Sequence, residues 1–180
     1  MLEQIQVVTE DCANTLAGQV ELRAIRPDDQ PALQRWLATV SPESRYARFL
    51  GFVSDLSSKQ WHYLTEVDGH DHVAFVARCD GKIAGVARWI RFADEPDLAE
   101  IAFLVGDDLQ RKGIGTLLCA RLVAAARANG IRRFRGYVLP HNRGIRRLLA
   151  APMFERLADT GRSIDVRIRD EAGAATHPAA

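Results

Sequence analysis

The pattern of apolar and polar residues predicts an alternation of strands and helices along the chain. Residues 20–24 alternate apolar with charged side chains, which is typical of a half-buried strand. The alternating runs 72–79 and 82–89 flank Asp80-Gly81, a dipeptide that favours a two-residue hairpin turn. The remaining predicted strand segments are 134–139 and a last hairpin that starts at Phe154 and ends with 163–168.

Apolar residues at helical spacing predict helices that begin near Pro27, Ser41 and Ser57, and a short helix that follows Asn142 and runs to Ala150. The first 18 residues show no strong period, so we expect them to be extended or loose. The chain is therefore divided into an N-terminal extension (1–18), one domain (19–170) and a flexible tail (171–180).

One stretch organises the rest of the pattern. Residues 99–105 form a continuous apolar run interrupted only by Glu100, which predicts a strand buried on both faces. A polar turn with Gly113 and Gly115 follows, and then an apolar-periodic helix that stops at Asn129-Gly130. Strand, glycine turn and helix together outline a phosphate-binding unit.

The chemistry of this turn favours an anion. Backbone N–H groups at a helix start have no intrahelical partner, and the helix dipole adds partial positive charge there. Gly113 and Gly115 allow an anion to approach the backbone closely, and Arg111 and Lys112 add two cations. The alternative is that the glycines only let the helix pack on its strand. The order of residues fits neither a P-loop, whose lysine follows the second glycine, nor a dinucleotide fingerprint, because Leu118 replaces the third glycine.

Composition narrows the class of protein further. The chain has 180 residues and a formal net charge of +1, and no run of apolar residues is long enough for a membrane span. Its three cysteines are far apart and fit neither a disulfide framework nor a zinc site, so we expect a cytoplasmic protein. His70-Asp71-His72 lacks further ligands, so we expect a polar loop and no metal.

Charge is distributed unevenly. From Arg111 to Phe154 the chain contains arginines and no Asp or Glu, which suggests a local anionic ligand. The arginines of this basic block could bind a phosphate of a cofactor, face solvent, or contact nucleic acid; no nucleic-acid recognition motif accompanies them, so we expect no nucleic-acid partner. The block consists of Arg132, Arg133, Arg135, Arg143, Arg146 and Arg147.

The pattern Gln/Arg-x-x-Gly-x-Gly after a buried Ala-Glu-Ile-x-Phe strand resembles the acetyl-CoA-binding motif of the GNAT superfamily of N-acetyltransferases. The resemblance implies an α/β (α+β) GNAT fold, with a mixed central sheet of six to seven strands and flanking helices over 19–170. It implies that the backbone of 103–105 binds the pantetheine arm, that 111–116 binds the pyrophosphate, and that Asn142 contacts the arm or only caps its helix. The residues implied to bind acetyl-CoA are Phe103, Leu104, Val105, Arg111, Lys112, Gly113, Ile114, Gly115, Thr116 and Asn142.

Glu100 is the candidate catalytic residue. An acceptor amine must lose its proton before it can attack a thioester, and a carboxylate over the cleft can accept that proton directly or through water. In the GNAT pattern a glutamate at this strand position is often the general base, so the resemblance gives Glu100 that role. The alternative is a salt-bridged glutamate without catalytic function.

Two positions depart from the family pattern. Many relatives carry a tyrosine seven residues after the asparagine, as general acid for the departing thiolate, but here that position is Leu149. Met153 stands where a glycine is usual. Another group or water must then protonate the thiolate; Tyr137 and His141 are nearby in the sequence, and neither is favoured.

The acceptor is suggested by a second resemblance. Ser44-Arg45-Tyr46-Ala47-Arg48-Phe49 and the stretches 67–70 and 105–110 are similar to the acetyltransferase domain of bacterial Pat-type protein lysine acetyltransferases. This similarity implies a protein lysine as acceptor, with a small-molecule amine as the alternative. A non-catalytic acyl-CoA-binding module is a further alternative, because the usual general acid is missing. The oligomeric state stays open.

Overall fold

The structure is a computed structural model and describes residues 11–53 and 55–170 of the chain. Eight strands form a single sheet in the order β1-β2-β3-β4-β5-β6-β8-β7. Every neighbouring pair is antiparallel except β5 and β6, which are parallel. The strands are β1 (Asp11–Thr15), β2 (Gly18–Ala24), β3 (His72–Cys79), β4 (Lys82–Phe92), β5 (Glu95–Val105), β6 (Arg133–Tyr137), β7 (Phe154–Asp159) and β8 (Ser163–Ile168).

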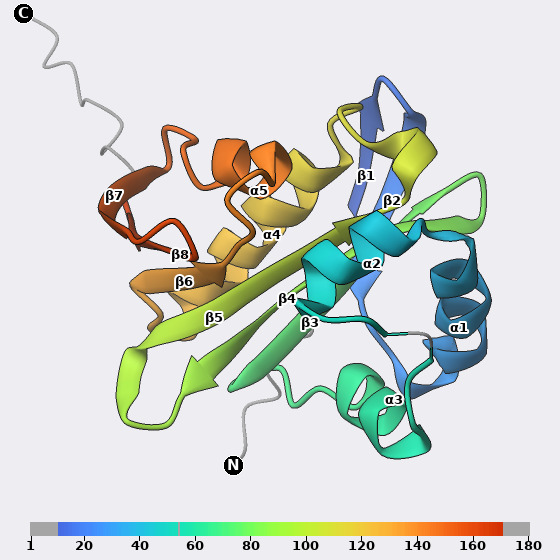
Figure 1. The fold of residues 1–180 in the computed structure, drawn as a ribbon, viewed down its shortest axis with the longest axis horizontal. Helices are drawn as coiled ribbons and strands as arrows, with labels where there is room; N and C mark the ends of the chain where they lie inside the picture. Colours follow the sequence, from blue (N-terminus) through green and yellow to red (C-terminus); the bar gives the residue numbers. More distant parts are fainter. Residues whose placement is uncertain (1–10, 54, 171–180) are drawn as a thin grey trace, which may run out of the picture.

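Helices lie on both sides of the diagonal strands in Figure 1, with α1, α2 and α3 on one side and α4 and α5 on the other. The helical elements are η1 (Pro27–Asp29), α1 (Gln30–Thr39), α2 (Pro42–Phe49), α3 (Ser58–Thr65), η2 (Asp107–Leu109), α4 (Ile114–Ala128) and α5 (Arg143–Leu148). None of the described helices is long and apolar enough to cross a membrane.

Two hydrophobic cores stabilise this arrangement, one on each face of the sheet. Side chains alternate along a strand, so successive residues of β5 contribute to different cores. Ile101 packs in the core that includes Leu118 and Leu122 of α4. Leu104 packs in the other core, with Leu33 of α1 and other residues of the helices on that side.

The sheet has eight strands, more than the six to seven predicted. The additional strand is β1, whose residues Asp11–Thr15 pair with Leu22–Gly18 of β2. β1 lies inside the predicted N-terminal extension, where the sequence has no apolar periodicity that would predict a strand. The domain boundary at residue 19 and the flexible tail stay predictions, and residues 1–10 and 171–180 lie outside the described part of the chain.

Several local predictions are confirmed. Asp80 and Gly81 have φ of 50° and 73°, the left-handed conformation that a two-residue hairpin turn requires. The side chain of Ser57 caps α3, and α4 ends at Ala128, directly before Asn129-Gly130.

Other boundaries differ by a few residues. β5 begins at Glu95 rather than Ala99, which shortens the loop expected over 93–97. Arg133 accounts for the difference, because its guanidinium donates hydrogen bonds to the carboxylates of Glu95 and Asp97 and holds this acidic segment beside β6. β6 itself covers Arg133–Tyr137 instead of 134–139.

Candidate active site

The parallel strands β5 and β6 separate in the middle of the sheet. They pair only through Leu98–Arg133, Ala99–Phe134 and Glu100–Arg135. Beyond Glu100, residues 101–105 of β5 pair with β4 alone, while the end of β6 pairs with β8. Within the described chain, the edge of β5 that faces β6 therefore carries no strand hydrogen bonds from Ile101 onwards.

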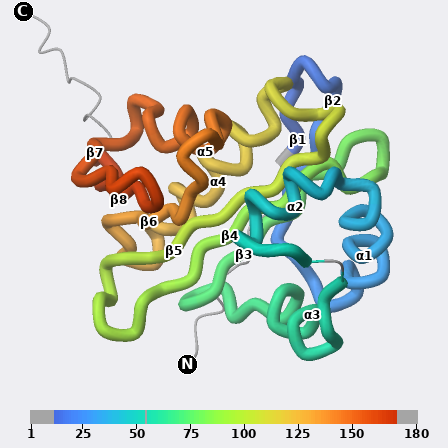
Figure 2. Tube along the Cα trace, in the orientation of Figure 1, coloured from blue at the N-terminus to red at the C-terminus, as the bar shows by residue number. Residues whose placement is uncertain are grey.

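A large cleft of about 1450 Å³ begins at this separation. Its walls come from the β1–β2 turn, α2, the end of β5, the glycine turn with the start of α4, and α5. Figure 2 shows the β1–β2 hairpin beside the loop that leads into α4. The predicted cofactor residues that line the cleft are Phe103, Leu104, Val105, Arg111, Lys112, Gly113, Gly115, Thr116 and Asn142.

Ile114 is the one predicted cofactor residue whose side chain does not line this cleft. It is 1% exposed and packs in the core under α4. Only its backbone belongs to the turn, so any contact of Ile114 with a ligand is through the main chain.

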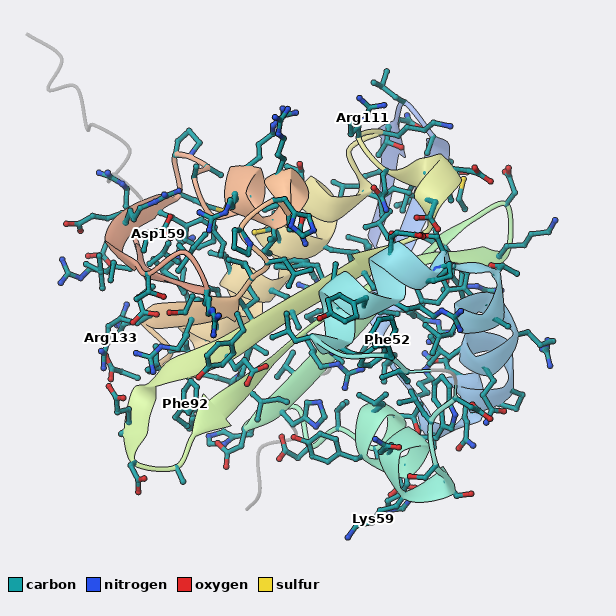
Figure 3. The ribbon with its side chains drawn as sticks, viewed as in Figure 1. Phe52, Lys59, Phe92, Arg111, Arg133 and Asp159 are labelled. Atoms are coloured by element: carbon teal, nitrogen blue, oxygen red, sulfur yellow. The ribbon has the colours of Figure 1, made fainter. Side chains whose placement is uncertain are left out.

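The glycine turn has the geometry of an anion-binding helix start. Gly113 is the N-cap of α4 and has φ of 96°, a conformation that L side chains rarely adopt. A side chain on Gly115 would meet Leu148 of α5 at 3.4 Å. Both glycines border the cleft, so the start of α4, where backbone N–H groups lack intrahelical partners, lies next to open space. Arg111, labelled in Figure 3, lies on the same loop.

The basic block of the sequence divides into two groups. Arg133, Arg135 and Arg146 are paired with Asp97, Asp165 and Asp159 at 2.7 to 2.8 Å, and Arg132 is paired with Asp170 at 3.6 Å. Hydrogen bonding to Asp97 and Asp165, respectively, raises the pKa of Arg133 and of Arg135. Arg143 and Arg147 instead line the cleft.

Helix α2 is attached to the loop that follows β5 by one carboxylate. Asp107 accepts hydrogen bonds from the backbone N–H of Ser41 (2.8 Å), the Ser41 hydroxyl (2.8 Å) and the Ser44 hydroxyl (2.6 Å). Gln110 adds a bond from its amide to the Ser44 hydroxyl (3.2 Å). Burial tends to raise the pKa of Asp107, but the hydrogen bonds from Ser44 and Ser41 outweigh it and the pKa lies below its usual value. This network fixes the α2 wall of the cleft against the wall that contains the glycine turn.

Among the described residues, Glu100 does not line the large cleft; it lies on the face of β5 that α2 covers. Its side chain shares that face with Leu104, four residues further along the strand. It is partly exposed, and Arg48 of α2 is the charged residue that approaches it. Burial lowers the pKa of Arg48, and attraction to Glu100 opposes this shift. Arg48 also lines the cleft, so it connects Glu100 with the cofactor-binding side.

No general acid stands at the family's usual position. Leu149 is 1% exposed and packs in the core, and a side chain on Gly136 of β6 would come within 2.8 Å of it. His141 lines the cleft, whereas Tyr137 does not. Cys119 of α4 also borders the cleft, but burial raises the pKa of its thiol to about 12, which keeps it protonated and poorly nucleophilic.

These features fit acetyl-CoA. The cleft exceeds the roughly 300 to 1000 Å³ of ordinary small-molecule pockets and has room for a long ligand. The helix start with Lys112 beside it suits a diphosphate, and the unpaired edge of residues 101–105 suits an amide-containing arm. No group of three or more His, Cys, Asp or Glu residues that could hold a metal occurs in the described chain.

Sequence reasoning found one side of this site and missed the other. The glycine turn was predicted from its own residues, whereas the end of β5 and Asn142, whose side chain caps α5 at 3.3 Å, were predicted from the resemblance to the GNAT family; all of them border the cleft. The β1–β2 turn, Arg48 and the Asp107 network were missed. Serines that precede a helix read as ordinary caps, and no local pattern shows that Asp107, 63 to 66 residues away, binds them.

Comparison with known proteins agrees with this geometry. The model of the acetyltransferase (GNAT) family matches residues 34–153. Acetyltransferase Pat of Mycolicibacterium smegmatis is 34% identical over 130 residues, which are 71% of this chain and 39% of that protein. An acetyltransferase of Pseudomonas aeruginosa is 30% identical over 151 residues, 82% of this chain and 81% of that protein.

Among solved structures, the GNAT domain of S. lividans PAT superposes with a TM-score of 0.79 at 31% identity, covering 88% of this chain and 96% of that domain. A cAMP-binding acyltransferase from Mycobacterium smegmatis superposes with a TM-score of 0.64 at 27% identity, over 96% of this chain and 51% of that one. The chain thus spans well under two thirds of the Mycolicibacterium relative. It belongs to the GNAT family of acetyltransferases, whose co-substrate is acetyl-CoA.

Proposed function

We propose that the protein transfers an acetyl group from acetyl-CoA to a lysine side chain of a protein, with Glu100 as the general base. One observation carries this proposal: Glu100 is the last residue of β5 that pairs with β6. The two strands separate directly beyond it. This supports a position for Glu100 near the opening between β5 and β6, on the face that α2 covers.

Proton removal is the task that requires a carboxylate here. A lysine amine has a pKa of about 10.4 and is almost fully protonated at neutral pH. Glu100 accepts a proton from the ammonium group, which frees the nitrogen lone pair for attack. Arg48 of α2 attracts Glu100 electrostatically and adds a positive charge beside the carboxylate.

Direct attack of the amine is the simplest route. Bound acetyl-CoA supplies an activated thioester, and the chain supplies binding and polarisation. Backbone N–H groups on the unpaired edge of β5 are placed to donate to a carbonyl oxygen. Cys119 borders the cleft, but its raised pKa argues against an acyl-cysteine intermediate. With Leu149 buried at the usual acid position, the leaving thiolate takes up, through water in the open cleft, the second proton that the nitrogen loses as the amide forms.

The choice of a protein lysine rests on likeness to Pat enzymes. The stretch around Ser44, Arg45 and Arg48 that carries the likeness forms α2, next to Glu100. Arg45 lies three residues before Arg48 on this helix, and Arg48 lines the cleft.

The test combines calorimetry with an acceptor panel. Acetyl-CoA is titrated into the protein, and thiol release is then followed with folded proteins, lysine peptides and small amines, with mass spectrometry of the products. Binding followed by acetylated lysine supports the proposal. Turnover with small amines only replaces the acceptor class, and binding without thiol release in any arm identifies a non-catalytic acyl-CoA-binding module.

A further inference from the structure

A second, smaller pocket lies between the sheet and helices α1, α2 and α3. Its volume of about 30 Å³ exceeds the roughly 10 to 15 Å³ that a cavity needs to hold one water molecule. The lining is apolar except for two arginines and two tryptophans. The residues are Leu33, Trp36, Leu37, Arg48, Phe49, Leu56, Trp61, Leu64, Val86, Arg88 and Leu104.

Arg88 brings a charge into this pocket from the middle of β4. The residue is only 5% exposed. Its guanidinium donates one hydrogen bond to Nε2 of His72 (2.9 Å) and one to the carbonyl of Leu64 (3.1 Å). Neither acceptor carries a charge. The carbonyl group is neutral, and burial, reinforced by repulsion from Arg88, lowers the pKa of His72 to about 4, so its imidazole is neutral as well. In the described part of the chain, no carboxylate bonds to Arg88.

Arg48 brings a second positive charge to the same pocket. Its guanidinium lies 5.0 Å from the centre of the Phe49 ring. The acidic group that attracts it is Glu100, which does not line the pocket. Burial, followed by repulsion from Arg48, lowers the pKa of Arg88 to about 9.

Trp61 provides an independent observation. Its side chain lines the pocket and the residue is 4% exposed, yet its indole Nε1–H has no hydrogen-bond acceptor in the described chain. A buried donor without an acceptor destabilises the folded protein, because it has lost its hydrogen bond to water. Every polar side-chain group that borders this pocket is thus a donor, and two of them carry positive charge.

We propose that this pocket binds one small monovalent anion such as chloride, held by the guanidinium groups of Arg48 and Arg88 and the indole N–H of Trp61. An anion accepts from all three donors. A water molecule of the same size would direct its own hydrogens at Leu37, Leu56 and other apolar side chains. The bound ion would join α2 and α3 to the sheet and keep Arg48 at the wall of the large cleft.

Thermal unfolding of the intact chain tests the proposal. Potassium chloride is exchanged for potassium gluconate at constant ionic strength, because gluconate is too large for the pocket. An anion that binds only the folded protein should raise Tm by roughly 3 to 6 °C for each tenfold increase in chloride above its Kd. Bromide should replace chloride and quench tryptophan fluorescence with saturation, since Trp36 and Trp61 both line the pocket.

Substitutions identify the site. Arg88→Met should abolish the chloride response, whereas Arg35→Met, which removes an exposed arginine of α1, should preserve it. Trp61→Phe should weaken chloride at least threefold. Trp36→Phe should leave the Kd within twofold, because Nε1 of Trp36 lies toward Gly106. Where Arg88→Met fails to fold, the pair of tryptophan variants decides.

Equal Tm in chloride and gluconate would overturn the proposal. So would a chloride response that survives in Arg88→Met, or equal chloride Kd values in the two tryptophan variants. None of these results depends on acetyl transfer.

Discussion

The two faces of β5 contrast in how they use the same strand. The face toward α4 contributes Phe103 and Val105 to a cleft that is also bordered by the glycine turn and its two cations. The face toward α2 contributes Glu100 and Leu104, and its charged groups are partly or fully buried side chains such as Arg48 and Arg88. We expect the first face to hold an anionic ligand and the second to position individual charges.

We therefore expect one face of β5 to determine the binding of acetyl-CoA and the other to determine turnover. Changes on the α4 face should alter the affinity for acetyl-CoA, whereas changes at Glu100 should alter turnover. Substitutions on each face, each with a matched control, can break this separation or define it more sharply.

The largest effect is expected for Glu100→Gln. The amide keeps the shape of the side chain but cannot accept the proton of the ammonium group, so kcat should fall by about 10² to 10⁴. The Kd for acetyl-CoA by calorimetry should stay within twofold. Glu155→Gln, which changes an exposed carboxylate of a salt bridge on β7, is the control. Unchanged kcat/KM of Glu100→Gln across the pH range would remove Glu100 from the mechanism.

A smaller effect is expected for Gly113→Ala. Gly113 and Gly130 flank the two ends of α4 with φ of 96° and 74°, so alanine strains the backbone at either position by about 1 to 2 kcal/mol. Only Gly113 borders the cleft. Gly113→Ala should therefore weaken acetyl-CoA about 5- to 10-fold, whereas Gly130→Ala should lower Tm without changing the Kd. Equal Kd values for both variants would contradict a role for the glycine turn in binding.

Arginines of α5 provide a third comparison. Arg147 lines the cleft, whereas Arg146 is paired with Asp159 at 2.8 Å. Arg147→Gln should weaken acetyl-CoA about two- to fivefold, and high salt should reduce the difference because it screens exposed charges. Arg146→Gln should lower Tm and leave the Kd unchanged. If Arg146→Gln weakened the binding of acetyl-CoA and Arg147→Gln did not, the Arg146–Asp159 ion pair would have to open when the ligand binds.

The smallest effect concerns the acid stability conferred by Asp107. The pKa of this carboxyl is lowered in the folded protein, so its contribution is fully present above the unfolded value of about 3.9 and is lost as the pH falls through the folded value. Asp107→Asn should therefore lower Tm at pH 7, and the difference from the unsubstituted protein should shrink as the pH falls below about 3.9. Asp108→Asn, at the neighbouring exposed position, should leave Tm unchanged. A difference that persists in acid would assign the effect to packing.

Features with local signals could be predicted from the sequence. The hairpin at Asp80-Gly81, the start of α3 at Ser57 and the end of α4 all follow from residues that are adjacent in the chain. The glycine turn was found for the same reason, because its strand, loop and helix are contiguous.

Features that depend on distant residues could not be predicted. Arg48 follows Ala47 in a short polar helix and resembles a solvent-exposed residue, and only the packing of α2 over β5 brings it toward Glu100. The burial of Arg88 was equally hidden, because an arginine in an apolar strand predicts neither His72 nor Leu64 as its acceptors. β1 was not predicted because an edge strand that pairs with a single neighbour needs little hydrophobic periodicity.

The hairpin of β1 and β2 also matters for the design of N-terminally truncated fragments of this chain. Asn14, Thr15 and Leu16 border the large cleft, and Thr15 lies 3.6 Å from the position of a side chain on Gly113. A recombinant fragment that starts at Gln19 would lose this part of the groove and leave the hydrogen-bonding edge of β2 bare. Such a fragment should therefore bind acetyl-CoA poorly and tend to associate through that edge, although it would retain every residue of the recognisable motif.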